Sequence, residues 1–399
     1  MIQERVILII NSGSSSIKFA IYNAGESMTK THSGKIENIG TDHVSLSVTD
    51  VLLNKKINDV IGTCDFRQSA DRLINYFKKN INSDRLQAIG HRVVHGMRIT
   101  EPSVIDENLL LVLKKISSFD PDHLPAEIEI IEKLKQIYPQ TPQVACFDTS
   151  FHASMPTVAK TFPLPRKFAN EGVQRYGFHG LSYSYVMEVL ETREGMSVSN
   201  GRIVIAHLGS GASLAAVKDG KCLDTTMGFT PTGGIMMGTR TGDLDPGVAW
   251  YMMEIKKMNA SKFNHLINHE AGLLGVSETT SDMQELLRRK ETDSRAAEAI
   301  DLFCYHVKKC IGSFIAVLGG IDTLVFTGGI GENSSAVRSS ICNGLNYAGI
   351  KIDGEKNKTN AFDISANGSV KVLVIQTDEE LVIARNTNRM YQQSKKITV

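Results

Sequence analysis

Two stretches of this chain share one pattern, and that pattern decides the fold. Val6–Tyr22 is VILIINSGSSSIKFAIY, and Ile203–Val217 is IVIAHLGSGASLAAV. Each combines an apolar strand, a turn rich in glycine and serine, and a second apolar strand, which is the pattern of a β-hairpin with a polar tip. When the two are superimposed, Gly13 falls on Gly209, half a chain away. The matched order favours a duplicated domain over two unrelated hairpins that merely use glycine and serine in their turns.

The rest of the chain alternates between helix and strand patterns. Helical apolar spacing covers Glu107–Ser117, Ala126–Tyr138 and Asp301–Leu318, and buried-strand patterns cover Val144–Phe147, Thr323–Phe326 and Val370–Ile375. Thr377–Glu380 has the form of a capping box that opens the last helix. Hairpins at the start of each half, followed by mixed helices and strands, predict α/β domains with mixed sheets. No Pro-rich or charged linker separates the halves, and we expect a boundary near residue 150.

Composition excludes several classes of protein. The 399 residues carry 44 Lys+Arg and 43 Asp+Glu, so the formal net charge is +1, which argues against a dedicated nucleic-acid binder. A hydrophobic content of 42% argues against disorder. The six cysteines are widely spaced without a C-x-x-C pair, which predicts reduced, mostly buried thiols rather than a zinc site or a disulfide framework. The apolar run Val6–Ile10 is too short for a signal peptide or a membrane span, so we expect a soluble cytoplasmic protein.

Three glycine-rich turns are candidates for phosphate binding: the two hairpin tips and Thr327–Asn333, which follows a strand pattern. Backbone N–H groups in such turns can bind phosphate because glycine lets the main chain approach closely, and a helix N-terminus adds a favourable dipole. Together the three turns favour nucleotide binding over turn formation alone. Neither G-x-x-x-x-G-K-[ST] nor G-x-G-x-x-G occurs at them, which argues against a P-loop enzyme and a dinucleotide-binding fold.

Six motifs, in chain order, resemble those of the acetate kinase family. They are Asn11–Lys18 (NSGSSSIK), Gly90–Gly96 (GHRVVHG), Phe147–His152 (FDTSFH), Arg175–Gly180 (RYGFHG), Met236–Asp243 (MMGTRTGD) and Phe326–Asn333 (FTGGIGEN). The resemblance covers nearly the whole chain and implies reversible transfer of the γ-phosphoryl group of ATP to a short carboxylate, acetate or propionate. It also implies Mg²⁺, or Mn²⁺, and a homodimer.

The resemblance carries an implied architecture as well. The family belongs with sugar kinases, heat-shock ATPases and actin, whose two duplicated ribonuclease-H-like, or actin-like ATPase, domains have mixed sheets and an interdomain cleft that holds ATP. For this chain it implies an N-terminal domain of residues 1–149 plus 382–399. Residues 150–381 would then form the C-terminal domain on the nucleotide side.

Residue chemistry is consistent with an anionic acceptor. Phosphoryl transfer to a carboxylate brings two anions together and needs no general base, so cations and oriented donors are required instead. Arg92 and Arg240 suit this task because a guanidinium can hold a carboxylate or a phosphoryl group bidentately. An isolated arginine would more simply form a structural salt bridge, and the resemblance is what favours catalysis. It also implies that His179 donates to a phosphoryl oxygen in the transition state.

The resemblance implies a metal site built from oxygen ligands. Asn11 and Glu379 would hold the metal, and the catalytic Asp148 would do so directly or through water. Alternatively, Glu379 complements the dipole of the last helix, in which Glu380 is the expected capping-box residue.

The implied ligand contacts form two sets. Those for ATP are Ser14, Ser16 and Lys18 on the first hairpin, His207, Gly209, Ser210 and Gly211 on the second, Asp282, Met283 and Gln284 near the adenine, and Gly329, Ile330, Gly331 and Asn333 on the late turn. Those for the acceptor are Arg92, Val94, Phe178 and Pro231, of which the apolar three would form a small acyl pocket. Apolar residues of this kind are otherwise core residues.

Several positions depart from the family pattern. Asp122 stands where a residue that lines the acyl pocket is usual, so either Leu124 substitutes after a local shift or the pocket is more polar. Ser210 replaces a common asparagine, Gln284 an arginine and Tyr183 a histidine. These changes leave the acyl and nucleotide preferences open.

Two other functions are alternatives to this one. A sugar or alcohol kinase of the same superfamily would need a carboxylate base near the acceptor hydroxyl, which Asp148 could provide, but the two arginines argue for an anionic acceptor. A nucleotide-switched binding protein of the actin or heat-shock kind would need a peptide-binding domain or a polymer surface. The sequence leaves little room for either.

Overall fold

The computed structural model describes residues 5–13, 16–25 and 27–397, and it divides into two compact units. The first comprises Met1–Ser150 and Asp378–Val399, and the second comprises Phe151–Thr377. The two divisions expected from the sequence lie after residue 149 and before residue 382, whereas the structure divides the chain after Ser150 and before Asp378. Because the second division falls before Asp378, Glu379 belongs to the unit that also contains Asn11 and Asp148.

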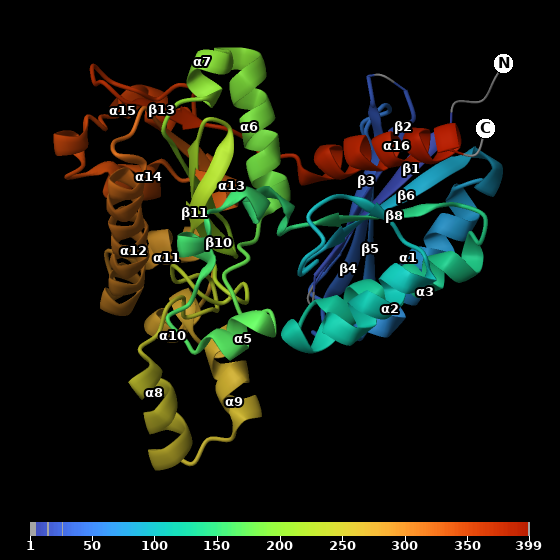
Figure 1. Cartoon of the computed structure of the whole chain (residues 1–399), viewed down its shortest axis with the longest axis horizontal. Helices are drawn as coiled ribbons and strands as arrows, with labels where there is room; N and C mark the ends of the chain where they lie inside the picture. Colours follow the sequence, from blue (N-terminus) through green and yellow to red (C-terminus); the bar gives the residue numbers. More distant parts are fainter. Residues whose placement is uncertain (1–4, 14–15, 26, 398–399) are drawn as a thin grey trace. The chain divides into compact units, whose positions relative to one another are not determined.

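The first unit contains, within the described residues, a mixed sheet of eight strands in the order β5-β4-β3-β2-β1-β6-β8-β7 (Figure 1). The strands are β1 Val6–Ser12, β2 Ile17–Asn23, β3 Lys30–Glu37, β4 Val44–Asp50, β5 Lys55–Gly62, β6 Leu86–Val93, β7 Ser103–Val104 and β8 Gln143–Phe147. The helices are α1 Phe66–Asn80, α2 Glu107–Ile116, α3 Leu124–Ile137 and α16 Glu379–Ile397.

The second unit contains a smaller sheet, which over the described residues has five strands in the order β11-β10-β9-β12-β13. The strands are β9 Ile203–Leu208, β10 Ala212–Lys218, β11 Lys221–Thr225, β12 Thr323–Thr327 and β13 Lys371–Val374. The helices are α4 Thr157–Lys160, α5 Arg166–Asn170, α6 Gly180–Glu194, α7 Met196–Ser199, α8 Pro246–Trp250, α9 Ala260–His265, α10 Gly272–Ser277, α11 Met283–Arg289, α12 Ser294–Leu318, α13 Gly328–Asn333, α14 Ser335–Cys342 and α15 Gly354–Lys358.

Five adjacent strands of the first sheet, β3-β2-β1-β6-β8, repeat the topology of the second sheet. In each, a hairpin (β1/β2 or β9/β10) is extended by an antiparallel strand on one side (β3 or β11) and by two parallel strands on the other (β6 and β8, or β12 and β13). Both tips are closed by a glycine N–H, from Gly13 to the Ser16 carbonyl at 2.8 Å and from Gly209 to the Gly211 carbonyl at 3.0 Å. The predicted duplicated α/β fold with mixed sheets is therefore confirmed.

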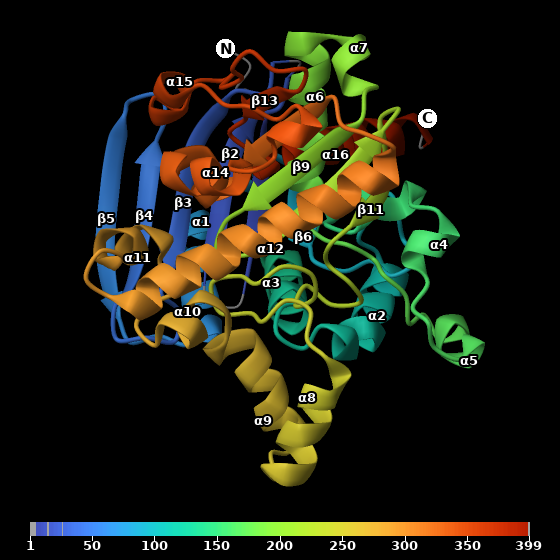
Figure 2. The ribbon, with the colours of Figure 1, turned by 90° about the vertical axis from the view of Figure 1, so that its left-hand side faces the viewer.

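Helices cover both faces of the central strands, which explains their continuous apolar sequence. In the first unit, Ile89 of β6 packs with the core residues of α1 and α3, such as Phe77 and Leu134. Its neighbour Gly90 points to the other face, where a Cβ atom would collide with the Thr387 side chain on α16. In the second unit, the buried residues of α6 pack with alternate residues of β9 and β10, and the long helix α12 lies along β9, β10 and β11 (Figure 2).

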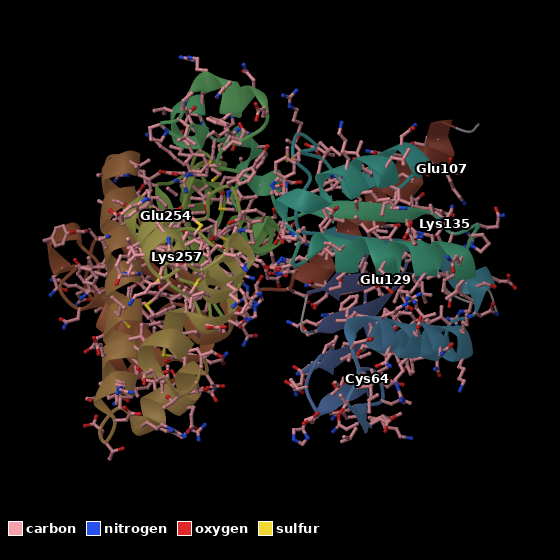
Figure 3. The ribbon with its side chains drawn as sticks, turned by 90° about the horizontal axis from the view of Figure 1, so that it is seen from below. Cys64, Glu107, Glu129, Lys135, Glu254 and Lys257 are labelled. Atoms are coloured by element: carbon pink, nitrogen blue, oxygen red, sulfur yellow. The ribbon has the colours of Figure 1, made fainter. Side chains whose placement is uncertain are left out.

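Charged helix ends on the first unit follow simple electrostatics. Glu107 lies in the first turn of α2 and Lys135 in the last turn of α3, both labelled in Figure 3, where their charges complement the helix dipoles. Lys135 also donates to the Pro139 carbonyl at 3.2 Å. Such charges stabilise the helix ends.

Two predicted helix starts are wrong. Helix α12 begins at Ser294 rather than Asp301, because the Asp293 side chain accepts the N–H groups of the first turn. Helix α16 is capped by Asp378, whose carboxylate accepts the Leu381 N–H at 2.9 Å, so the expected capping box is absent. The Thr377 hydroxyl has no hydrogen-bond partner among the described residues. Glu380 lies 3.7 Å from the Lys30 amino group instead.

The prediction that the cysteines are mostly buried is confirmed. All six lie in the described part of the chain as free thiols, and only Cys310 is partly exposed. In the described residues no helix has both the length and the apolar character needed to cross a membrane.

Candidate functional site

The first unit gathers four predicted residues at one edge of its sheet. The parallel strands β1, β6 and β8 end there, and Asn11, Arg92 and Asp148 lie at or just beyond those ends. Arg92 donates from Nε and Nη2 to one Asp148 carboxylate oxygen at 3.1 and 2.7 Å. Asn11 Nδ2 donates to Glu379 Oε2 at 3.2 Å, which adds the start of α16 to the cluster.

Arg92 is the cation among several carboxylates. Its side chain is 15% exposed, and burial alone would lower its pKa, but the charges of Asp148, Glu127 and Glu379 outweigh burial and raise it. Burial raises the pKa of Glu379, and the nearby Asp148 charge raises it further, against the opposing effect of Arg92. The edge is thus rich in oxygen ligands and depends on cations for its charge balance.

Glu127 is a member of this cluster that the sequence analysis missed. It lies on α3 and is 1% exposed; Oε2 accepts the Val94 N–H at 3.0 Å, and Oε1 lies 3.9 Å from Arg92 Nη1. Burial raises the pKa of Glu127 to about 8, although Arg92 and the Val94 N–H oppose the shift. A signal was available, since Glu127 shares the buried face of its helix with Ile131 and Leu134, a spacing at which apolar residues are expected.

Glu127→Gln is expected to stabilise the protein relative to the wild type, increasingly so as pH rises from about 5 to about 8. The unfolded Glu127 releases its proton near pH 4.5, whereas the folded one keeps it up to about pH 8, so the wild type loses stability across that interval. The amide oxygen introduced by the substitution would accept the Val94 N–H, but the amide does not titrate. Urea unfolding at several pH values measures the difference.

The control is Glu129→Gln, two residues away on the same helix, where the carboxylate is 33% exposed and paired with Lys133. Its stability difference from the wild type should not increase across this pH interval. A difference for Glu127→Gln that is constant with pH would show that Glu127 is ionised in the folded protein throughout.

The second unit places His179 beside the tip of its hairpin. His179 precedes α6 with a left-handed φ of 59°, and its Nδ1 lies 2.9 Å from the Ser213 hydroxyl. Its ring stacks on that of His207, with centroids 4.3 Å apart and planes inclined by 28°. A Cβ atom added to Gly211 would lie 3.1 Å from His179 Nε2, so this nitrogen faces the tip.

Arg240 reaches the same tip. The Cβ position of Gly211 is also 3.9 Å from Arg240 Nη1, and that nitrogen donates to the Pro231 carbonyl at 3.3 Å. The loop that carries Arg240 is tied to the hairpin by the Gly238 N–H, which donates to the Ser210 carbonyl at 3.0 Å. The structure therefore brings together the predicted residues His179, Arg240, Pro231 and Gly211.

The late glycine-rich turn lies next to this hairpin. It forms the short helix α13 after β12, and Gly328 begins it with a φ of 77°, where a Cβ atom would meet the Leu208 carbonyl at 2.7 Å. A Cβ atom at Gly209 would lie 3.9 Å from the Gly329 N–H nitrogen. Glu332, which the sequence analysis did not select, accepts the Gly328 and Thr377 N–H groups at 2.9 and 3.0 Å. The second hairpin tip and the α13 turn therefore lie next to each other.

The remaining nucleotide candidates have mixed surroundings. Asp282 caps α11 through the Glu285 N–H at 2.9 Å, Met283 is buried and Gln284 is exposed. Asn333 Nδ2 donates to the Gly329 carbonyl at 3.0 Å, and both Ile330 and Gly331 lie within α13. Lys18 is exposed on β2 of the first unit, and its charge lowers the pKa of Glu379. Ser16 closes the first tip through its carbonyl, and Ser14 lies outside the described residues.

The predicted acyl pocket residues are divided between the units. Val94 belongs to the first, and Phe178 and Pro231 belong to the second; all three are buried. Asp122 is half-buried, and Leu124 is fully buried as the first residue of α3.

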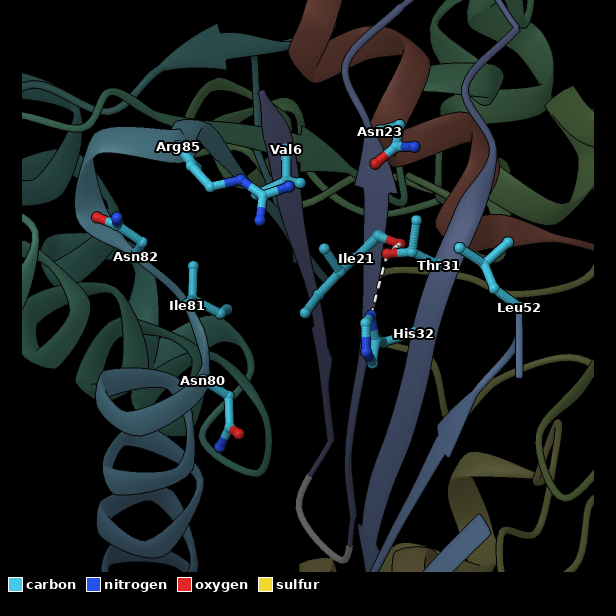
Figure 4. A pocket seen from close by; sticks show the side chains of 10 residues that line it. All are labelled: Val6, Ile21, Asn23, Thr31, His32, Leu52, Asn80, Ile81, Asn82 and Arg85. Carbon is cyan, nitrogen blue, oxygen red and sulfur yellow. Dashed lines mark hydrogen bonds between the residues drawn. The ribbon is translucent and has the colours of Figure 1, made fainter. Parts of the chain in front are cut away.

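A cavity of about 310 Å³ in the first unit lies apart from these residues (Figure 4). It is lined by Val6, Ile21, Asn23, Thr31, His32, Leu52, Asn80, Ile81, Asn82 and Arg85. His32 Nδ1 lies 3.1 Å from the Thr31 hydroxyl, the contact drawn in Figure 4. None of these ten residues is a predicted site residue.

Comparison with known proteins identifies the family. The sequence profile of the acetokinase family matches residues 6–385. The chain is 42% identical over 393 residues to an acetate kinase of Rhodopseudomonas palustris, covering 96% of this chain and 98% of that one. It is 39% identical over 395 residues to a propionate kinase of Salmonella typhimurium, covering 96% of each. The crystal structure of a propionate kinase from Francisella tularensis superimposes with a TM-score of 0.90 at 35% identity, over 97% of this chain and 100% of that one. With its motifs, its duplicated fold and these relatives in agreement, the chain belongs to the acetokinase family.

Proposed function

We propose that this protein is a short-chain carboxylate kinase that transfers the γ-phosphoryl group of ATP to acetate, reversibly, giving acetyl phosphate and ADP. One observation carries the proposal: each of the two hairpin tips has an arginine beside it. Arg92 Nη1 lies 3.5 Å from the Ser12 carbonyl at the first tip, and Arg240 Nη1 approaches Gly211 at the second. Propionate is the second candidate acceptor, because the relatives include propionate kinases as well as acetate kinases.

In this proposal the positively charged residues bind and stabilise the anionic reactants. A carboxylate acceptor is ionised at neutral pH, so it attacks without a general base, and the guanidinium groups offset the repulsion between it and the phosphates. Arg92, oriented by Asp148, would hold the acceptor, and Arg240 would stabilise charge on the transferring group. His179 would donate from Nε2 to the same group. The N–H groups of the hairpin tips and of the α13 turn would bind the nucleotide phosphates.

We propose that Glu379, Asn11 and Asp148 hold Mg²⁺, or Mn²⁺. The donor set fits, since carboxylate and amide oxygens are the ligands that these ions prefer. A divalent cation at this place would also offset the Asp148 charge, which raises the pKa of Glu379. Across the described residues, no three His, Cys, Asp or Glu side chains are grouped to hold a metal by themselves. Mg²⁺ commonly completes such a site with phosphate oxygens and water, and it would supply charge neutralisation.

The test is to incubate the protein with ATP, Mg²⁺ and acetate, propionate or butyrate, and to trap acyl phosphate with hydroxylamine. Hydroxamate should form with acetate or propionate. Release of ADP with glucose or glycerol as the acceptor would instead support the alcohol-kinase alternative. If no short carboxylate yields hydroxamate, the proposed function is wrong.

Gly211→Ala should lower kcat by about tenfold or more, because small displacements of reacting groups are costly. The added Cβ would lie 3.1 Å from His179 Nε2 and would displace either the ring or the phosphoryl group. Gly211 is not among the glycines with positive φ, so the fold should tolerate alanine. The matched control is Gly354→Ala at the start of α15, where the Cβ enters open space and kcat should not change. An unchanged kcat in Gly211→Ala would contradict the placement of the phosphoryl group at this tip.

We also propose that the protein is a cytoplasmic homodimer, as the resemblance implies. The free cysteines suit a reducing compartment. On the second unit, Trp250, Tyr251 and Ile255 are 60%, 42% and 54% exposed, and neighbouring exposed apolar side chains commonly mark an interface. Light scattering coupled to gel filtration should give a mass of two chains.

A further inference from the structure

We propose that Tyr183 and Ser213 are positioning residues that fix the tautomer of His179, so that its ring proton lies on Nε2. The proposal rests on the proposed function, in which His179 donates from Nε2 to the transferring phosphoryl group. From the sequence, Tyr183 was noted only as a departure from a common histidine, and Ser213 was not among the predicted site residues.

The three side chains form a short chain of hydrogen bonds. His179 Nδ1 lies 2.9 Å from Ser213 Oγ, and the Tyr183 hydroxyl lies 2.5 Å from the same oxygen. Tyr183 and Ser213 are both fully buried, whereas His179 is half-buried. Solvent is therefore excluded from the inner end of the chain, where hydrogen bonds are strengthened by the low local dielectric.

Local structure explains why these groups meet. His179 immediately precedes α6 and Tyr183 lies four residues later in its first turn, where the Tyr183 N–H donates to the His179 carbonyl at 3.1 Å. Ser213 is the second residue of β10 and follows the tip closed by Gly209 and Gly211. The hairpin thus supplies both the phosphate-binding turn and the hydroxyl that contacts the imidazole.

The direction of donation follows from the groups themselves. Each hydroxyl has one proton to donate, and a neutral imidazole has one donor nitrogen and one acceptor nitrogen. A phenol is a stronger acid than an alcohol, and imidazole nitrogen is a better base than either oxygen, so Tyr183 donates to Ser213 and Ser213 donates to His179 Nδ1. With Nδ1 accepting, the ring proton of the neutral His179 is on Nε2.

The position of Nε2 is the second observation behind the proposal. Nε2 faces the Gly211 backbone, 3.1 Å from the Cβ position of that residue, and Arg240 Nη1 lies 3.9 Å from the same point. Stacking on His207, whose own Nδ1 is 2.8 Å from the Ser182 hydroxyl, holds the plane of the ring. The stack therefore fixes the ring orientation, and the hydroxyl pair fixes which nitrogen carries the proton.

The primary experiment is long-range ¹H–¹⁵N correlation NMR of the histidine side chains in the full-length protein at neutral pH. The His179 signals are assigned by their loss in His179→Gln. We expect a single tautomer with the proton on Nε2 in the wild type. Protonation on Nδ1 would overturn the proposal, whatever the activity of the enzyme.

Two variants test this chain of hydrogen bonds from Tyr183 through Ser213 to His179, which we call the relay. A third variant on the same helix is the control. Ser213→Ala removes the donor to Nδ1, and Tyr183→Phe removes the donor to Ser213; both should shift the His179 nitrogens toward a mixture of tautomers. The kcat should fall by about tenfold or more in Ser213→Ala and less in Tyr183→Phe, with KM for ATP and acetate within about twofold of wild type. Tyr185→Phe removes a half-buried hydroxyl two residues along α6 and should change neither measurement.

The outcomes separate this proposal from the proposed function. If both relay variants have the NMR shifts and the kcat of Tyr185→Phe, the relay is wrong even though the enzyme is a carboxylate kinase. If the wild type forms no acyl hydroxamate, the proposed function fails, while the tautomer measurement still reports on Tyr183 and Ser213. Should Ser213→Ala fail to fold, the wild-type spectrum and Tyr183→Phe decide the question.

Discussion

Arg92→Ala is expected to lower the turnover of acyl phosphate formation by about a hundredfold or more, and to destabilise the protein as well. Arg92 would hold the acceptor carboxylate, and loss of the correct position of a reacting group commonly has that effect on turnover. The stability loss has a separate cause, because Arg92 is the cation that pairs with the Asp148 carboxylate, which is 1% exposed. Removing one partner from a buried ion pair costs roughly 3–5 kcal/mol.

Arg92→Lys separates these two effects. An ammonium retains the positive charge beside Asp148, so the free energy of unfolding should recover in part. It lacks the planar fork that bonds Asp148 through two nitrogens, so turnover should stay at least about tenfold below wild type. Turnover is measured by hydroxamate formation per folded molecule, with urea unfolding in parallel. Near-normal turnover in Arg92→Lys would show that a point charge suffices and would contradict the bidentate role.

Arg240→Ala should lower turnover by a similar factor. Arg240 is half-buried, and its Nη1 contact is with the neutral Pro231 carbonyl at 3.3 Å. ATP binding, followed by calorimetry, should be weakened far less than turnover, because the interaction belongs to the transition state.

The control for Arg240→Ala is Arg288→Ala on α11, where the side chain is 71% exposed and paired with Glu285 at 2.7 Å. That exposed pair contributes little to stability, and turnover should equal that of the wild type. An Arg240→Ala variant with the turnover of Arg288→Ala would remove Arg240 from the mechanism. Arg92 would then be the one predicted catalytic arginine left.

The elements that could be predicted from sequence are those whose pattern is local. Both hairpins were identified because an apolar run, a glycine-rich tip and a second apolar run are contiguous, and their pairing at Ser12 with Ile17 and at Leu208 with Ala212 follows. Strand β5 lacks such a signal, since Lys55–Gly62 is mostly exposed and shows no alternation of buried residues. Its place at the sheet edge comes from pairing with β4.

The incorrect starts of the helices show the limit of local reasoning. Thr377 is a good capping residue by sequence, but its N–H is bound by Glu332, which lies 45 positions earlier, and Asp378 caps α16 instead. Asp293 starts α12 before the apolar spacing becomes visible. In both cases a side chain that binds backbone N–H groups decided the boundary.

The sequence by itself determined the family and the duplicated hairpins, and it singled out Arg92, Arg240 and His179 as candidates, because these depend on contiguous motifs and on residue chemistry. Only the tertiary structure decided the partners of those residues. Asn11 meets Glu379 across 368 positions, Glu127 joins Arg92 from a separate helix, and Ser213 and Tyr183 meet at His179. The physical reason is that hydrogen bonds and ion pairs act over a few ångströms in space, and sheet topology determines which distant residues come that close.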